Sequence, residues 1–233
     1  MVASMSLRRD DRVLEIGPGD GALTAHLVDA LDRLVVVEID RDLVARLQRR
    51  FPGIAVVEAD ILRVDLGTLL ASSRDWRIVG NLPYNISTPL LGRLLDVTAS
   101  VRDMFFLLQR EVVDRLAARP GTKDWGRLSV MAQLQLDVEP LFDVAPGNFR
   151  PAPKVQSTFV RLRPRPPDAS IDRAIFDRLV RTAFQQRRKR LSNALQSFDI
   201  DWVRAPVDPG LRPDAVDLAG YVALARFVAE ECA

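Results

Sequence analysis

A short apolar segment followed by closely spaced glycines places the strongest constraint on the fold. Arg12–Ile16 is predicted to form a strand, and the run Gly17-Pro18-Gly19-Asp20-Gly21 leads from it into a helical pattern over residues 22–31. A strand, a glycine-rich turn and a helix in this order are typical of the opening of a doubly wound α/β sheet. The glycines let the backbone approach a ligand closely, and the helix N-terminus offers unpaired N–H groups.

The spacing of these glycines limits the kind of ligand. It is G-x-G-x-G, whereas the dinucleotide fingerprint is G-x-G-x-x-G, and the Lys-Ser/Thr ending of a phosphate loop is missing. A nicotinamide cofactor or a nucleoside triphosphate is therefore less favoured than a ligand without a pyrophosphate.

Acidic residues follow the next two expected strands, which cover residues 34–37 and 54–57. Glu38 lies about 20 residues beyond the glycines, where a carboxylate can accept hydrogen bonds from both hydroxyls of a ribose. Asp60 could accept one from an adenine amino group. Together with Glu15 they mark the carboxyl edge of the sheet, where open α/β folds bind ligands.

A turn after the expected strand 76–79 is the candidate for chemistry. It reads Val79-Gly80-Asn81-Leu82-Pro83-Tyr84-Asn85 and places an amide, a proline and an aromatic ring side by side. Such a group can grip the exocyclic amine of a base pulled out of a nucleic acid. Asn, Pro and Gly are also common in ordinary strand-to-helix turns. These residues alone leave both interpretations open.

The rest of the chain predicts two domains. Further strands are expected at residues 104–108, 137–144 and 155–162, the last two paired as a hairpin, and helices at 41–50, 87–95, 110–118 and 128–134. The proline-rich stretch 163–169 predicts a linker, and helical patterns follow at 171–185, 187–198 and 214–230. We expect a catalytic domain over residues 1–165 and a small helical domain over 166–233.

Charge and cysteine content limit the partners and the compartment. The net charge is only +2, so local clusters must carry any nucleic-acid binding. Residues 185–190 hold four cations, which predict phosphate contact, although such a run is often only a solvated face. A single cysteine, Cys232, favours the cytoplasm. One histidine makes a zinc site improbable, so we expect no metal, and no apolar run is long enough for a membrane span.

Several stretches resemble known enzyme families. Leu14–Gly19 and Val37–Asp40 are similar to the S-adenosylmethionine-binding motifs of class I methyltransferases, and residues 81–87 to the catalytic motif of ribosomal RNA adenine dimethyltransferases. Residues 108–112, 126–133, 149–155 and 184–189 extend the resemblance to the KsgA-type enzymes. These dimethylate two adjacent adenosines near the 3′ end of small-subunit rRNA.

The resemblance implies a fold, a cofactor and a partner. The fold would be an α/β class I methyltransferase (Rossmann-like) with a mostly parallel sheet, an antiparallel terminal strand and a small all-α C-terminal domain. The cofactor would be S-adenosylmethionine. The partner would be small-subunit rRNA within an immature small ribosomal subunit, bound by a cytoplasmic monomer linked to ribosome biogenesis, with no membrane and no metal.

Residue roles follow from the motifs and from the chemistry of adenine. Asn81 and the Leu82 carbonyl would each accept one N6 hydrogen, Pro83 would hold the turn, and Tyr84 and Phe149 would stack on the base or, alternatively, only pack. The expected cofactor-binding residues are Glu15, Gly17, Gly19, Glu38, Ile39, Asp60, Ile61 and Asn81. The expected RNA-binding residues are Arg110, Lys123, Arg127, Arg150, Lys154, Arg187, Arg188, Lys189 and Arg190.

The sequence departs from the family pattern at two points, and three other functions are weighed against the one that the resemblance implies. The family has a Gln-Asn/His-Phe-Leu segment before its first strand, which this sequence lacks, so we expect weaker cofactor binding. Gln156 stands where the family has Asp, and it receives no function here. A large-subunit dimethyltransferase of the macrolide-resistance type and a non-catalytic ribosome-assembly factor stay open. A DNA adenine methyltransferase is less favoured, because those enzymes show two prolines after the Asp or Asn.

Overall fold

The computed structural model describes residues 1–83, 85–149 and 155–231 and divides into two compact units. The first comprises Met1–Val113 and Asp137–Pro164, and the second Asp114–Leu136 and Arg165–Ala233. The expected boundary lay after residue 165, so residues 114–136 join a different unit from the one anticipated. Trp125 and Val130 explain this, because both are buried in the core of the helical unit.

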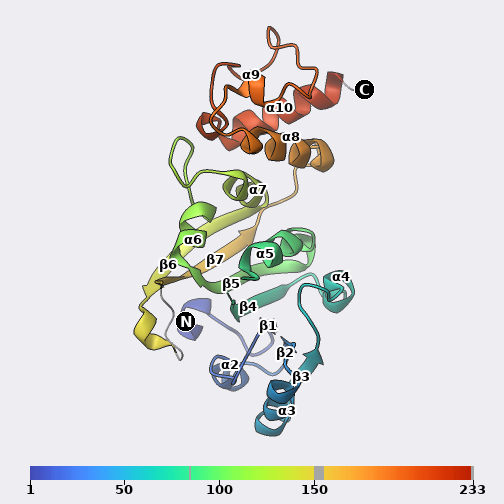
Figure 1. Ribbon diagram of the computed structural model, residues 1–233. Coiled ribbons are helices and arrows are strands. Elements are labelled where there is room, and N and C mark those ends of the chain that lie inside the picture. The colour runs from blue at the N-terminus through green and yellow to red at the C-terminus, as the bar shows by residue number, and fades with distance from the viewer. Residues whose placement is uncertain (84, 150–154, 232–233) are drawn as a thin grey trace. The chain divides into compact units, whose positions relative to one another are not determined.

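A seven-stranded sheet, in the order β3-β2-β1-β4-β5-β7-β6, forms the centre of the first unit (Figure 1). The first five strands run parallel, and β7 is antiparallel to β5, as the fold class requires. The strands are β1 (Arg12–Ile16), β2 (Leu34–Glu38), β3 (Ala55–Glu58), β4 (Trp76–Asn81), β5 (Val101–Gln109), β6 (Leu136–Val144) and β7 (Ser157–Pro164).

Two helices of the first unit begin at an aspartate that caps them. Asp40 accepts hydrogen bonds from the N–H groups of Asp42 and Leu43, and Asp65 accepts one from Thr68, so the first turns are satisfied. The helical segments are α1 (Val2–Met5), α2 (Thr24–Ala30), α3 (Arg41–Arg50), α4 (Leu66–Leu70), α5 (Ser87–Leu95), η1 (Thr98–Ser100), η2 (Pro146–Asn148) and α6 (Arg110–Leu116), which ends in the second unit.

Strand register brings the predicted site residues to one edge of the sheet. Glu15 lies opposite Val36 and Val79, and Asn81 lies opposite Leu107. Because these strands are parallel, their carboxyl ends meet at the same edge. The glycine turn after β1, Glu38 at the end of β2 and Asn81 at the end of β4 therefore belong to one region.

A buried ion cluster lies at the other end of β4. The Arg77 side chain is 5% exposed. Its guanidinium donates to both carboxylate oxygens of Asp103 (2.7 and 2.9 Å), to Asp11 at 2.9 Å and to the carbonyl of Met5 at 2.7 Å. Two more guanidiniums, those of Arg102 and Arg161, pair with the same carboxylates. We call these five charged residues the Arg77 cluster.

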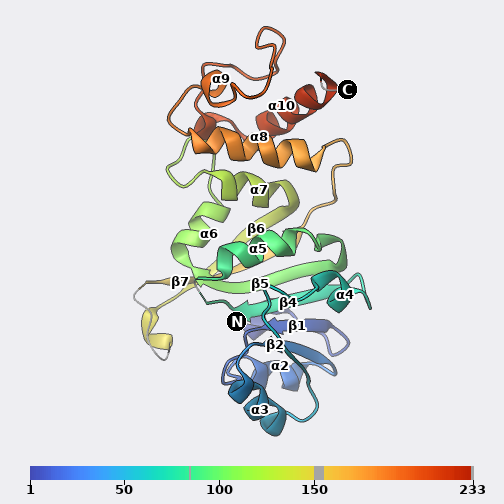
Figure 2. The same cartoon turned by 45° about the vertical axis from the view of Figure 1, so that its right-hand side comes forward.

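The second unit consists mainly of helices joined by turns and loops. It contains α7 (Arg127–Gln135), α8 (Arg173–Gln185), α9 (Leu191–Ala194), η3 (Pro213–Ala215) and α10 (Leu218–Glu231). Figure 2 shows α8 between α7 and α10, and α8 packs on both. The helix expected over residues 187–198 was wrong at both ends, because α9 covers only Leu191–Ala194. Residues 186–189 instead form a turn, in which the Lys189 N–H donates to the Gln186 carbonyl at 2.8 Å. Nowhere in the described ranges is a helix both long and apolar enough to span a membrane.

Candidate active site

The glycine turn after β1 presents open backbone. Gly17 and Gly19 adopt φ values of +62° and +58°, which favour glycine, and a Cβ built on either would have no atom within 4 Å. The Gly17 N–H donates to the Val37 carbonyl at 3.0 Å, so the turn is tied to β2. The turn therefore leaves space beside its backbone in which a ligand could lie.

Glu38 supports this turn with its carboxylate. Its Oε2 accepts from the Gly19 N–H at 3.2 Å, and its Oε1 accepts from the N–H groups of Ile39 and Asp40 at 2.8 and 3.1 Å. A carboxylate has about four lone-pair sites, so it can still accept from a ligand hydroxyl. Ile39 is 64% exposed beside it and offers an apolar surface to a flat ring. The bond to Gly19 is a role that the sequence did not predict.

Glu15 is a buried carboxyl at the end of β1. Thr24 donates its hydroxyl to Glu15 Oε2 at 2.7 Å. Burial raises the pKa of Glu15 to about 7, against the lowering effect of the Thr24 hydrogen bond and with a further raising effect of the Glu38 charge. The carboxyl therefore titrates near neutral pH.

We expect Glu15→Gln to stabilise the protein at alkaline pH and to change little at acidic pH. The pKa of Glu15 is raised from 4.5 to about 7 in the folded state, so the folded protein holds an extra proton between these values. Stability is therefore lost as pH rises through this window. Urea unfolding should give the variant a free energy of unfolding about 1–3 kcal/mol above wild type at about pH 8 and nearly equal at about pH 4. A difference that does not vary with pH would contradict this.

Asp60 and Ile61 follow β3 and form its link to the next helix. Asp60 Oδ1 accepts from the Leu62 N–H at 2.9 Å, and its Oδ2 lies 3.5 Å from Arg63 Nε. Ile61 is buried. The carboxylate of Asp60 keeps acceptor capacity, and its contact with an adenine amino group stays a prediction.

Asn81 ends β4 with an exposed side chain. The next residue, Leu82, donates its N–H to the Leu107 carbonyl at 3.3 Å, while the Pro83 carbonyl accepts from the Ile86 N–H and the Ser87 hydroxyl. Within the described ranges, no hydrogen bond reaches the Leu82 carbonyl. The amide oxygen of Asn81 and the Leu82 carbonyl are thus neighbouring acceptors. Tyr84, predicted to stack on the base, lies outside the described residues.

Gly80 is required by the close approach of β1. A Cβ there would lie 2.8 Å from the Ile16 carbonyl oxygen and 3.0 Å from Leu82 Cδ2. We expect Gly80→Ala to lower the free energy of unfolding by about 1–3 kcal/mol, because a backbone atom must move. Gly92→Ala is the matched control: Gly92 lies in α5 with nothing within 4 Å of its added Cβ. Its substitution should be neutral or stabilising by up to about 1 kcal/mol, and equal effects of the two changes in urea unfolding would contradict the steric argument.

The loop between β6 and β7 carries Phe149. This ring is half-buried against the core of the first unit, and its N–H donates to the Pro146 carbonyl at 3.1 Å. The packing alternative therefore has direct support, and stacking on a base stays a prediction. Arg150 and Lys154, expected to contact RNA, lie outside the described residues.

Arg110 is held by Asp143 of β6 and by Gln156, the residue before β7. Its Nη1 donates to Asp143 Oδ2 at 3.0 Å and to Gln156 Oε1 at 3.3 Å, and its N–H donates to the Gln156 carbonyl at 3.0 Å. The Thr158 hydroxyl donates to the other oxygen of Asp143 at 2.6 Å. Asp143 thus neutralises a cation assigned to RNA, and Gln156 gains a structural contact that the sequence analysis did not foresee.

The predicted RNA-binding cations of the second unit fall into two groups. Arg127 pairs with Asp177 at 3.0 Å, and Arg187 pairs with Asp214 at 3.1 Å. The others are exposed, and none has an ion pair with another residue that the structure describes: Lys123, Arg188, Lys189 and Arg190. This second group is the better candidate for contact with phosphate.

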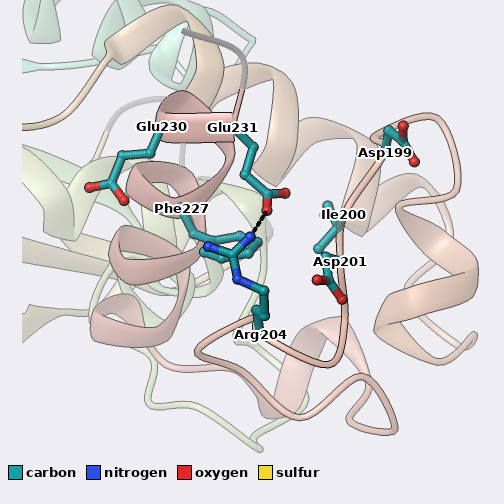
Figure 3. Close-up of a pocket in the computed structure, with 7 residues that line it drawn as sticks. All are labelled: Asp199, Ile200, Asp201, Arg204, Phe227, Glu230 and Glu231. Carbon is teal, nitrogen blue, oxygen red and sulfur yellow. Dashed lines mark hydrogen bonds and ion pairs between the residues drawn. The ribbon is translucent and has the colours of Figure 1, made fainter.

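Two pockets are lined mostly by residues that were not predicted to belong to the functional site. One of about 640 Å³ in the second unit is shown in Figure 3 and is lined by Asp199, Ile200, Asp201, Arg204, Phe227, Glu230 and Glu231. Its four carboxylates outnumber its single guanidinium, so it would repel a phosphate. Another of about 250 Å³ in the first unit is lined by Gly19, Asp20, Arg46, Leu47 and Arg50. Among the described residues, no three His, Cys, Asp or Glu side chains gather as a metal site would require.

Sequence comparisons agree with this geometry. A family model described as "Ribosomal RNA adenine dimethylase" matches residues 1–206. The protein named ribosomal RNA small subunit methyltransferase A from Pseudomonas fluorescens (strain Pf0-1) is 47% identical over 238 residues, covering 99% of this chain and 88% of the relative. A protein of the same name from Aromatoleum aromaticum is 50% identical over 225 residues, covering 94% of this chain and 84% of the relative.

Solved structures share the fold. A dimethyladenosine transferase from Plasmodium falciparum superposes with a TM-score of 0.81 at 22% identity, covering 96% of this chain and 91% of the other. The 23S rRNA methyltransferase ErmE gives a TM-score of 0.69 at 26% identity, with 97% and 94% covered. The overall fold is therefore common to all three chains.

Proposed function

Because this chain belongs to the ribosomal RNA adenine dimethylase family, we propose that it dimethylates the N6 amines of two adjacent adenosines in the 3′-terminal hairpin of small-subunit rRNA. S-adenosylmethionine is the methyl donor. Over the aligned residues, the relatives named for the small subunit are 47–50% identical to this chain, whereas the 23S rRNA enzyme is 26% identical. That difference favours the small subunit over the large one.

One observation carries the proposal: the acceptor pair of Asn81 and Leu82 lies at the same sheet edge as Glu15 and Glu38. A methyl donor held by the carboxylates and a base held by the acceptors would then meet at the ends of neighbouring strands. This is the place where open α/β sheets bind their ligands.

The residues beside the glycine turn fit the donor. Glu38 has acceptor capacity left for a ribose hydroxyl, Ile39 offers an apolar face to adenine, and the open backbone at Gly17 and Gly19 leaves room for the rest. Buried Glu15 offers a negative charge to a cationic group once deprotonated. When bound, the cofactor supplies a methyl group on a sulfonium, a strong electrophile, so no covalent enzyme intermediate is needed.

The task of the protein is then to orient adenine N6. The lone pair of this nitrogen is delocalised into the ring, which makes it a poor nucleophile. We assign the Asn81 side-chain oxygen and the Leu82 carbonyl to accept one N6 hydrogen each, which favours an sp³-like nitrogen with its lone pair free for the methyl group. Pro83 restricts the backbone after Leu82 and keeps the carbonyl in place. A neutral Asn also accepts the bulkier monomethylated amine.

Holding the base outside its helix requires aromatic contact. Extrusion costs a few kcal/mol, and stacking on an aromatic ring returns roughly 1–3 kcal/mol per base. Tyr84 and Phe149 are the rings that we propose for this contact. The half-buried position of Phe149 is compatible with one face packed on the core and an edge toward the base.

We extend the proposal to the partner and to the setting. The enzyme would act as a monomer in the cytoplasm on immature small ribosomal subunits. The single cysteine supports a reducing compartment. The sulfonium needs no Lewis acid, so the reaction as proposed involves no metal ion.

The decisive experiment uses small subunits that lack the modification. They are incubated with the protein and labelled S-adenosylmethionine, and modified adenosines are mapped. We expect two adjacent N6,N6-dimethyladenosines near the 3′ end of the small-subunit rRNA. Label in large-subunit rRNA alone would favour the macrolide-resistance type, and binding without label would favour a non-catalytic assembly factor.

A further inference from the structure

Hydrogen bonds within the second unit occupy the guanidinium of Arg187. Its Nε donates to Asp214 Oδ2 at 3.1 Å, and its Nη2 donates to the carbonyls of Lys123 at 2.9 Å and Thr122 at 3.2 Å. Three of its five N–H groups are thereby used. The side chain is 37% exposed. We call this contact between residues 122–123 and Asp214 the Arg187 clasp.

The loop that the clasp holds is fixed at both ends as well. The Gly121 N–H donates to the Asp214 carbonyl at 2.7 Å, with Gly121 at φ +79°, a value that favours glycine. Trp125 is buried in the helical core and donates its Nε1 to the Val216 carbonyl at 3.0 Å. Lys123 stands between these anchors, so the clasp fixes the backbone from which its side chain extends.

Exposed cations lie next to the clasp residues in the sequence. Arg188, Lys189 and Arg190 follow Arg187 directly, and the Lys123 carbonyl lies at the tip of the Arg187 side chain. Arg187 pairs with Asp214, whereas none of the four exposed cations, Lys123, Arg188, Lys189 and Arg190, has an ion pair in the described part of the chain. The clasp thus joins a cation of one loop to cations of another turn, 64 positions apart at the Arg187–Lys123 contact.

We propose that Arg187 and Asp214 are positioning residues that assemble one phosphate-binding surface from Lys123, Arg188, Lys189 and Arg190. The proposal rests on the proposed action on rRNA and deepens it. Arg187 acts through the loop that it holds, and Asp214, an anion, supports binding of a polyanion. The partner is the phosphate backbone of small-subunit RNA.

Simple electrostatics predicts the opposite sign for Asp214. Removing a carboxylate beside a cation cluster raises the local positive potential, so Asp214→Ala should tighten RNA binding if Arg187 contacts phosphate directly. If the clasp positions Lys123, the same change weakens binding. Arg187→Lys separates the readings further, because lysine keeps the charge but loses the planar fork of donors.

The test measures binding of the full-length protein to unmethylated small subunits over a range of salt concentrations. We expect Asp214→Ala and Arg187→Lys each to weaken binding roughly three- to tenfold and to lower the salt slope by about one phosphate contact. Lys123→Ala should do the same in the wild-type background and add nothing in the Arg187→Lys background. Thermal unfolding checks that each variant is folded. If Asp214→Ala is not folded, Arg187→Lys provides the test of the clasp.

Two outcomes would overturn the clasp: tighter or unchanged binding of Asp214→Ala, or a further loss from Lys123→Ala in the Arg187→Lys background. The double variant Arg188→Ala, Lys189→Ala tests the surface itself, and an unchanged salt slope there would show that this face does not bind RNA. Mapping of dimethylated adenosines at saturating enzyme is independent of these affinities. It would therefore still report the proposed methyl transfer if the clasp fails.

Discussion

Asn81→Ala should bring methyl transfer near the detection limit while RNA binding stays almost unchanged. The side chain contributes one of two acceptors that orient adenine N6, and it lies exposed at the end of β4, outside the core. Loss of one pre-positioned polar group of this kind typically costs roughly 10²–10³-fold in kcat. Label transferred to unmethylated small subunits measures the rate, and a salt-dependent binding titration measures affinity.

Asn85→Ala is the matched control for this change. Asn85 is the same residue type, is exposed, and belongs to the same turn, but no acceptor role is assigned to it. It should keep most of the activity. If Asn81→Ala turns over as fast as Asn85→Ala, the mechanism in which Asn81 orients the amine is wrong.

Arg77→Ala should lower the free energy of unfolding by about 3–5 kcal/mol, because it removes the most deeply buried of the cations that pair with the carboxylates of Asp11 and Asp103. Arg77 bridges Asp103 and Asp11 and also donates to the Met5 carbonyl, so one guanidinium links β4, β5 and the segment before β1. Chemical unfolding measures the loss. Hydrogen exchange of β4 and β5 amides assigns it to the first unit, since a chain with two units need not unfold in one step.

Arg41→Ala provides the contrast for the cluster. Arg41 also pairs with a carboxylate, that of Glu58 at 2.8 Å, but its side chain is 87% exposed. Such a pair contributes about 0–1 kcal/mol. Similar losses for the two variants would mean that burial of the Arg77 cluster has little energetic weight.

The sequence predicted the sheet well where the signal was local. The helix Arg41–Arg50 was predicted with its observed bounds, because Asp40 caps it directly and apolar residues follow at helical spacing. The carboxyl-edge placement of Glu15, Glu38 and Asn81 also followed from strand ends alone. Each of these features depends on residues close together in the chain.

Features that depend on distant residues escaped prediction. Arg110 looked available for RNA, yet Asp143 neutralises it from 33 positions away. Arg187 looked equally available, yet its partner Asp214 lies 27 positions away. Trp125 gave no local sign that its segment packs with the helical unit, since burial of an indole is decided by the helices that surround it. A charge run shows which side chains are cationic but not which of them are already paired.

The division of the second unit into two separate segments has a consequence for synthesis. As the chain leaves the ribosome from its N-terminus, Trp125 emerges before any part of α8 or α10, whose residues complete its core. One edge of β5 likewise has no pairing strand until β7 is synthesised about 50 residues later. The first unit cannot finish folding before β7 is complete at Pro164, and the second cannot finish before α8 and α10 are made. Until then the nascent chain carries an unpaired strand edge and an exposed indole. Chaperone contact during translation should therefore concentrate on residues 101–136.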